Sequence, residues 1–201
     1  MAFWGADHTE RSTINDPKRK FRFLVQIDGM QLSSGEGDSV MWYAKTVTKP
    51  GFSIAPAEHK YLNHTFYYPG SVTWQDVAVT FVDPQSPDTS ELMSKIVEDA
   101  GYAVPANSNV LSTLSKASIG SRIGGVTIKQ LNADGVTIES WKLWNPIITE
   151  VKYGDLAYGD DNLIELSMTF KYDWATLTPT STSDDSDDVN DSTPIFSPQN
   201  A

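Results

Sequence analysis

Strict alternation of apolar and polar residues near the C-terminal end of the chain restricts its fold more than any other feature. Between Leu163 and Trp174 apolar side chains occupy every second position. The apolar set is Ile164, Leu166, Met168, Phe170 and Tyr172, and the polar set is Glu165, Ser167, Thr169 and Lys171. A period of two places the two sets on opposite faces of a β-strand. We therefore predict a strand with one face packed on a core and the other face polar.

Similar alternation predicts further strands, at Phe21–Ile27, Gln75–Val82, Val126–Leu131, Val136–Trp144 and Ile147–Tyr153. Asn132 to Gly135 separate two of them, and an Asp-Gly ending is typical of a hairpin turn. One helix interrupts the pattern, because Asp88 suits the N-cap, apolar residues follow at helical spacing, and Gly101 suits the C-cap. The sequence predicts an antiparallel β domain of about seven strands with one flanking α-helix.

The ends of the chain and one internal segment differ from this β pattern. Residues 1–17 are polar and irregular, and residues 176–201 are rich in Thr, Ser, Asp and Pro without any Lys or Arg. That composition is typical of disorder. Residues 102–125 are rich in Ser, Ala and Gly, and we predict a long surface loop there. The expected organisation is a leader at 1–17, a β domain at 18–175 and an acidic tail at 176–201.

Composition disfavours several classes of function. The 201 residues include no cysteine, which excludes disulfides and thiolate chemistry, and the net charge is −11. Proteins that grip nucleic acid need clustered Lys and Arg instead. No stretch approaches the ~20 apolar residues that span a bilayer. The N-terminus does not match a signal peptide, so we expect a protein that is made in the cytosol and is not inserted in a membrane.

Catalytic and metal-binding patterns are weak. The histidines are His8, His59 and His64, and the last two stand five residues apart, a spacing that places them on one face of neither a helix nor a strand. A metal site needs converging ligands. No nucleophile-elbow pattern is present, and the Gly120–Gly125 segment lacks the Lys-Ser/Thr ending of a phosphate-binding P-loop. We expect no enzymatic activity, no catalytic residues, no metal and no cofactor.

Six segments, taken in order, resemble the tail tube proteins of contractile-tailed bacteriophages, the myoviruses. They are Lys20–Ile27, Tyr43–Gly51, Tyr67–Thr80, the helix at 88–100, Trp141–Ile147 and Leu163–Trp174. Each is weak alone, and their order and spacing together carry the resemblance, which covers about residues 18–175. The sequence departs from the family pattern at Asn145, in the 102–125 segment and in the acidic tail.

The resemblance implies a β-sandwich or flattened barrel with a flanking α-helix and long loops. It also implies hexameric rings that stack into a helical tube, with neighbouring sheets joined around a central channel. Ring closure would pair the sheet edges that are a liability in a monomer. The implied function is a structural one in the virion. Inside a contractile sheath, the tube conducts DNA during genome ejection without binding it specifically. The implied partners are further copies of the chain and the sheath, baseplate and terminator proteins, assembled in the host cytoplasm.

Two sets of residues are candidates for roles in such a tube. The polar set of the 163–174 strand, Glu165, Ser167, Thr169 and Lys171, is expected to face the channel. The Lys49–Leu62 segment, expected as a loop stiffened by its prolines, offers Phe52, Ile54, Pro56 and Tyr61 as contacts with the adjacent ring.

Other functions remain open at this point. The chain could be a tube initiator or baseplate protein of the same fold, or the tube of a phage-derived particle that carries no DNA. A carbohydrate-binding β-sandwich, with Trp42, Trp74, Trp141 and Trp144 stacked on sugars, is the alternative from another class.

Overall fold

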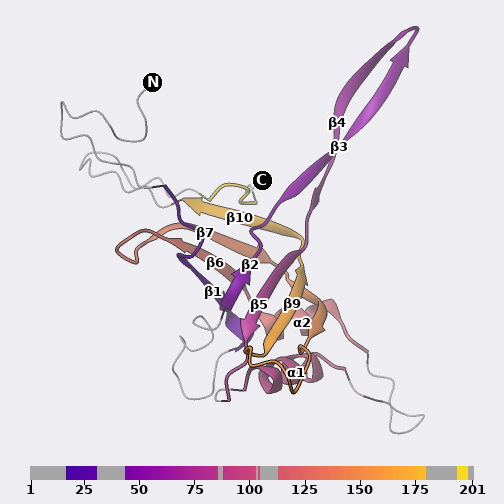
Figure 1. Cartoon of the computed structure of the whole chain (residues 1–201). Coiled ribbons are helices and arrows are strands. Elements are labelled where there is room, and N and C mark those ends of the chain that lie inside the picture. Colours follow the sequence, from indigo (N-terminus) through magenta and orange to yellow (C-terminus); the bar gives the residue numbers. More distant parts are fainter. Residues whose placement is uncertain are drawn as a thin grey trace, which may run out of the picture.

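A computed structural model describes residues 17–30, 44–85, 88–102, 104, 113–179 and 194–198. Within these residues ten strands form three antiparallel sheets, accompanied by two α-helices and one short 3-10 helix, η1 (Asp28–Met30) (Figure 1). Sheet A has the strand order β1-β6-β7-β10 and sheet B the order β2-β5-β9-β8. The remaining two strands, β3 and β4, form a separate hairpin. The antiparallel, mainly β architecture agrees with the prediction from the sequence.

The bounds of the strands are as follows. Sheet A contains β1 (Phe23–Ile27), β6 (Val126–Leu131), β7 (Thr137–Trp144) and β10 (Trp174–Pro179). Sheet B contains β2 (Ala44–Val47), β5 (Val77–Val82), β9 (Glu165–Lys171) and β8 (Ile147–Lys152). The hairpin consists of β3 (Phe52–Tyr61) and β4 (His64–Trp74).

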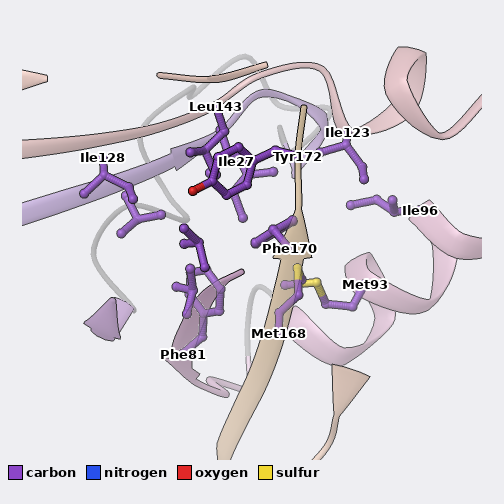
Figure 2. Close-up of a cluster of buried hydrophobic side chains, with 14 of the residues drawn as sticks. Ile27, Phe81, Met93, Ile96, Ile123, Ile128, Leu143, Met168, Phe170 and Tyr172 are labelled. Atoms are coloured by element: carbon purple, nitrogen blue, oxygen red, sulfur yellow. The ribbon is translucent and has the colours of Figure 1, made fainter. Parts of the chain in front are cut away.

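A single hydrophobic core joins sheets A and B. Sheet A contributes Val25, Ile27, Val126, Ile128, Leu143 and Ala175, and sheet B contributes Val77, Val79, Phe81, Leu166, Met168 and Phe170. Figure 2 shows side chains from both sheets and from α1 gathered in this cluster. In β9 the predicted packed face is confirmed for Leu166, Met168 and Phe170, whereas Ile164 precedes the strand and is 40% exposed. Alternation therefore arises where one face of a strand is removed from water.

Two helices pack against this core. Helix α1 (Thr89–Asp99) begins at the predicted N-cap, where the Asp88 carboxylate accepts a hydrogen bond from the Glu91 amide at 3.0 Å. It ends before Gly101, whose φ of +106° favours glycine. Helix α2 (Lys116–Ile123) lies within the predicted 102–125 loop and corrects that prediction. Its Ser- and Gly-rich sequence has low helix propensity, but Ser115 caps it and Ile123 is buried in the core.

The β3–β4 hairpin corrects the expected loop at Lys49–Leu62. Phe52–Tyr61 is a strand, paired along its length with His64–Trp74, and the hairpin projects from the body of the molecule (Figure 1). Every residue of β3 is exposed. The alternation that starts at Phe52, Ile54 and Pro56 does not continue to Glu58 and Lys60 on the same face, and neither face of β3 is buried. This strand was therefore not predicted, and the strand count in the described residues rises from about seven to ten.

The C-terminal boundary also differs from the prediction. Strand β10 continues past residue 175 to Pro179, paired with β7 from Trp174↔Trp144 to Pro179↔Glu139. Thr176 is buried, so residues 176–179 belong to sheet A although their composition is polar. The aspartates at 184–191 and the leader residues 1–16 lie outside the described residues.

The core predicts a contrast between two phenylalanines. Replacing the buried Phe170 by alanine should lower the free energy of unfolding by about 3–5 kcal/mol, because it removes apolar contacts and leaves a cavity. Phe66→Ala in the hairpin is the matched control and should change it by less than about 1 kcal/mol. Urea unfolding of the unassembled protein measures both, and equal losses would contradict the description of the hairpin as separate from the core.

Candidate assembly interface

The hairpin presents two different faces. Directly opposed residues of paired strands share a face, so the register assigns each side chain. We name the face near the base the base strip: it contains Phe52, Ile54 and Pro56 of β3 with Pro69, Val72 and Trp74 of β4. We name the other face, near the tip, the aromatic strip: it contains His59, Tyr61, His64, Phe66 and Tyr68. Three of the predicted inter-ring residues therefore lie on the base strip, and Tyr61 lies on the aromatic strip.

Ring contacts anchor the base of the hairpin to the body. The Phe52 ring lies edge-on to Trp74, with ring centroids 5.3 Å apart, and Phe196 lies 5.6 Å from each of them. Ile195, beside Phe196, pairs with Leu177 of β10 through hydrogen bonds of 2.7 and 3.1 Å. Phe52 is thus already engaged within the subunit, whereas Ile54 (48% exposed) and Tyr61 (64% exposed) are available to a partner.

A register shift lies midway along the hairpin, between Ile54 and Pro56. Gly70 is required there, because a Cβ at this position would stand 2.3 Å from the carbonyl oxygen of Ala55. Such bulges increase the local twist of a strand pair. The bulge therefore sets how the distal half of the hairpin is oriented relative to its base.

His59 and His64 lie on the same face of the hairpin, which was not predicted from the sequence. His59 lies opposite Phe66, and His64 lies opposite Tyr61, so both imidazoles belong to the aromatic strip. The turn at Leu62 and Asn63 reverses the chain between them, which puts residues five apart on one face. Among the described residues no group of three His, Asp or Glu side chains is placed to hold a metal.

The outward face of sheet B holds the residues expected to line a channel. Ser167 lies opposite Thr80 and Thr169 lies opposite Ala78, while their neighbours Leu166, Met168 and Phe170 point into the core. Glu165 forms an ion pair with Lys45, and the Lys171 ammonium lies 3.9 Å from the Asp76 carboxylate. The four side chains thus share one face, in which hydroxyl groups lie between balanced charges.

Sheet B has two edges. In the described part of the chain, β2 pairs only with β5, and β8 pairs only with β9. A strand paired on one side presents N–H and C=O groups that another chain can use. These edges lie on opposite sides of the polar face that contains Ser167 and Thr169.

A buried carboxylate on sheet A binds two lysines from other segments of the chain. Glu139 of β7 is 8% exposed, forms ion pairs with Lys18 and with Lys49 at 2.8 Å, and accepts a hydrogen bond from the Trp141 indole at 2.6 Å. Burial acts to raise the pKa of Glu139, but the bonds from Lys18, Lys49 and Trp141 outweigh it and lower the pKa to about 2. The ion pairs join the segments before β1 and β3 to sheet A.

Other perturbed groups also serve the fold. Lys116 of α2 and Asn145 bond to Asp173 and lower the pKa of its carboxyl, which fixes the turn between β9 and β10. Burial and the nearby Asp76 carboxylate raise the pKa of the Tyr172 phenol to about 12. The Asp173 carboxylate is thus occupied in holding neighbouring segments together.

The tryptophans are likewise engaged within the chain. The Trp144 indole donates to the Thr176 hydroxyl at 2.9 Å and stacks on Trp174, with ring centroids 5.9 Å apart. Trp141 donates to Glu139, and Trp74 packs at the hairpin base. Their rings therefore do not form the exposed platform that a sugar-binding site uses, and Trp42 lies outside the described residues.

Comparison with solved structures identifies the fold. A chain from the anti-feeding prophage baseplate matches with a TM-score of 0.57 at 12% identity, over 82% of this chain and 97% of that one. A chain from the cap of the same particle, described as a tube-terminating cap, matches with 0.59 at 13% identity, over 87% and 99%. A chain from the sheath-tube complex of an extracellular contractile injection system matches with 0.58 at 13% identity, over 82% and 93%.

The fold is that of the tail tube proteins. The sequence itself matches no protein-family model and no curated protein. None of the described helices is long and apolar enough to cross a membrane.

Within the tail tube fold, the sequence revealed some candidate residues and missed others. The polar face of β9 was visible because its opposite face is buried. The aromatic strip was missed, since Phe66 and Tyr68 become its members only when β4 pairs with β3. The prevalence of Thr, Phe and Tyr in His64–Trp74 was the available signal, because these residues favour strands.

The Glu139 cluster predicts a pH dependence of stability. The pKa of about 2 in the folded chain lies below the ordinary value of 4.5, so Glu139 stabilises the fold above pH 4.5. This stabilisation, on the order of 3 kcal/mol, is lost as the pH falls from about 4.5 to 2. Glu139→Gln should lower the free energy of unfolding at pH 7. In the variant this free energy should also fall much less between pH 4.5 and 2, as measured by urea unfolding. Glu150→Gln, at an exposed pair with Lys152, is the control and should change little.

Proposed function

We propose that this chain is the repeating structural subunit of the tube of a contractile tail. The observation that carries the proposal is the match of nearly the whole fold to chains from the anti-feeding prophage and from an extracellular contractile injection system, at TM-scores of 0.57 to 0.59. Two features of this chain support it: sheet edges available for pairing and a long projecting hairpin. Both are typical of a subunit that is completed by its neighbours.

In the proposed ring, sheet B of one subunit joins sheet B of the next. The edge strand β2 of one copy would pair with the edge strand β8 of its neighbour, which gives every subunit the same two contacts. Contacts between different surfaces close into a ring when the rotation between copies closes. We propose six copies in each ring, as the resemblance to myovirus tail tubes implies.

The channel would be lined by the outward face of sheet B, including Glu165, Ser167, Thr169 and Lys171. Lys45 offsets Glu165 and Asp76 offsets Lys171, so this face has nearly balanced charge with hydroxyls between. A surface of this kind gives the phosphate backbone few cations to bind. It suits a tube through which DNA passes during genome ejection without being held.

Stacking of rings would use the hairpin. Phe52, Ile54, Pro56 and Tyr61, the candidates for inter-ring contacts, all lie on β3. Phe52 would act indirectly, by fixing the hairpin base through Trp74 and Phe196. Ile54, Pro56 and Tyr61 are exposed in the subunit and would become buried against the adjacent ring.

The outer surface of the tube would meet a contractile sheath, and its ends would meet baseplate and terminator proteins. One neighbour is described as part of a sheath-tube complex, and others as parts of a baseplate and a tube-terminating cap. The same fold therefore occurs in several positions within such particles. A tube initiator or baseplate protein is accordingly the second candidate, and the tube of a particle that carries no DNA is a third.

Electron microscopy of the purified protein tests the proposed function. Negative staining should show rings or hollow tubes with a channel about as wide as one DNA duplex, because every subunit carries both halves of each contact. A protein that stays monomeric, even after baseplate components are added, would contradict a tube subunit and favour an initiator. Copy number per particle separates the two roles.

Size-selective labelling tests the lining of the channel. The chain has no cysteine, so Ser167→Cys introduces a single thiol on the outward face of sheet B. In assembled tubes a small maleimide should label it while a long polymer-linked maleimide should react at least tenfold more slowly than with the free subunit. Ala133→Cys, in the exposed β6–β7 turn, is the control and should accept both reagents. Equal reaction of Ser167→Cys with the polymer reagent in tubes and subunits would place this face outside the channel.

A further inference from the structure

The tip of the hairpin bears apolar side chains that are exposed to solvent. Tyr61, Phe66 and Tyr68 of the aromatic strip are exposed, and Leu62 at the turn is 88% exposed. The His64 and Phe66 rings pack edge-on with centroids 4.7 Å apart, which gives the strip a defined shape. The strip contains no acidic side chain. Exposed aromatic surface of this extent marks a site of interaction with a protein partner.

An apolar recess of about 420 Å³ lies between α1, α2 and β8. Val97 and Ala100 of α1, Ile119 of α2 and Val151 of β8 contribute to its lining, and Tyr102 and Leu114 are exposed beside them. The hydroxyls of Ser94 and Tyr153, which are hydrogen-bonded to each other at 2.9 Å, supply polar groups. The recess is thus suited to one or two aromatic side chains with a polar tip.

The hairpin and the recess lie on opposite sides of the molecule. Figure 1 shows the hairpin leaving the body on the side away from α1 and α2. With ten residues in β3, the hairpin reaches roughly 33 Å at the usual rise per residue. A subunit therefore cannot place its own hairpin tip in its own recess, whereas a second copy stacked in the same orientation can. Contacts between opposite ends of identical molecules repeat along a line.

We propose that the aromatic strip of one subunit docks in the recess between α1, α2 and β8 of a subunit in the adjacent ring. The proposal rests on the proposed tube function and names the surface that receives the hairpin. The occupant is a second copy of this chain, entering through Tyr61, His64 and Phe66. The imidazoles and phenol of the strip would meet the Ser94 and Tyr153 hydroxyls of the recess.

Docking at this position would couple the contacts between rings to the contacts within a ring. Ile148, Glu150 and Val151 of β8 line the recess, and β8 is also a free edge of sheet B. A hairpin seated against β8 would therefore hold in place the strand that pairs with the neighbouring subunit. The Gly70 bulge orients the strip for this contact, since it sets the twist of the distal hairpin.

Disulfide trapping between two single-cysteine chains tests the docking. Tyr61→Cys subunits are mixed with Leu114→Cys subunits, assembled into tubes and oxidised. Non-reducing electrophoresis should show covalent dimers that a reductant removes, at a yield at least fivefold above either variant alone. His64→Cys mixed with Tyr102→Cys is the second pair, chosen because each residue lies beside the first pair in the strip or at the recess.

Ala133→Cys replaces the recess variant in the control, because its turn lies on sheet A, and it should give no dimers with Tyr61→Cys. Dimers in either test pair but not in this control support the docking. Tubes without dimers in both test pairs overturn the docking and leave the tube function standing. Failure of the unaltered chain to form tubes overturns the proposed function and the docking with it.

Discussion

Burial of the inner faces of sheets A and B against one another is the interaction on which the rest of the molecule depends. Phe81 and Phe170, on neighbouring strands of sheet B, are fully buried, and α1 and α2 add Met93 and Ile123 to the same cluster. Since side chains alternate along a strand, fixing this apolar face also fixes the opposite one. The polar outward face of β9, with Ser167 and Thr169, is therefore a consequence of core packing.

The hairpin, unlike sheets A and B, is not held by burial of one of its faces in the core. Its strands pair with each other, and in the described part of the chain their base is held to the body through Phe52, Trp74 and Phe196. A two-stranded ribbon gains little stability in water by itself. The ring cluster at the base and the hydrogen bond from the Gln75 amide to the Gly51 carbonyl at 2.8 Å orient it. The subunit thus combines a core that folds by its own burial with a projection whose surface is completed by another molecule.

The sequence predicted the sandwich strands well and the projecting parts poorly, for one physical reason. Alternation records burial, so the strands that contain Val126, Leu143 and Met168 were visible. It is silent about β3, which is exposed on both faces, and about α2, whose short Ser- and Gly-rich segment is helical because Ile123 packs in the core. The channel candidates followed from the pattern of a single strand. The aromatic strip depends on a pairing register, which local sequence does not specify.

The two prolines of the hairpin protect the free subunit from pairing in the wrong way. Pro56 and Pro69 are directly opposed. Proline is tolerated in a sheet where its missing N–H would point away from the partner strand, so each outer edge of the ribbon lacks one donor at the same level. A strand from another unassembled copy cannot extend along either edge without a gap in its hydrogen bonds. The hairpin can therefore stay long and exposed while subunits accumulate. Its binding to a partner then depends on its side chains and not on hydrogen bonds from its backbone.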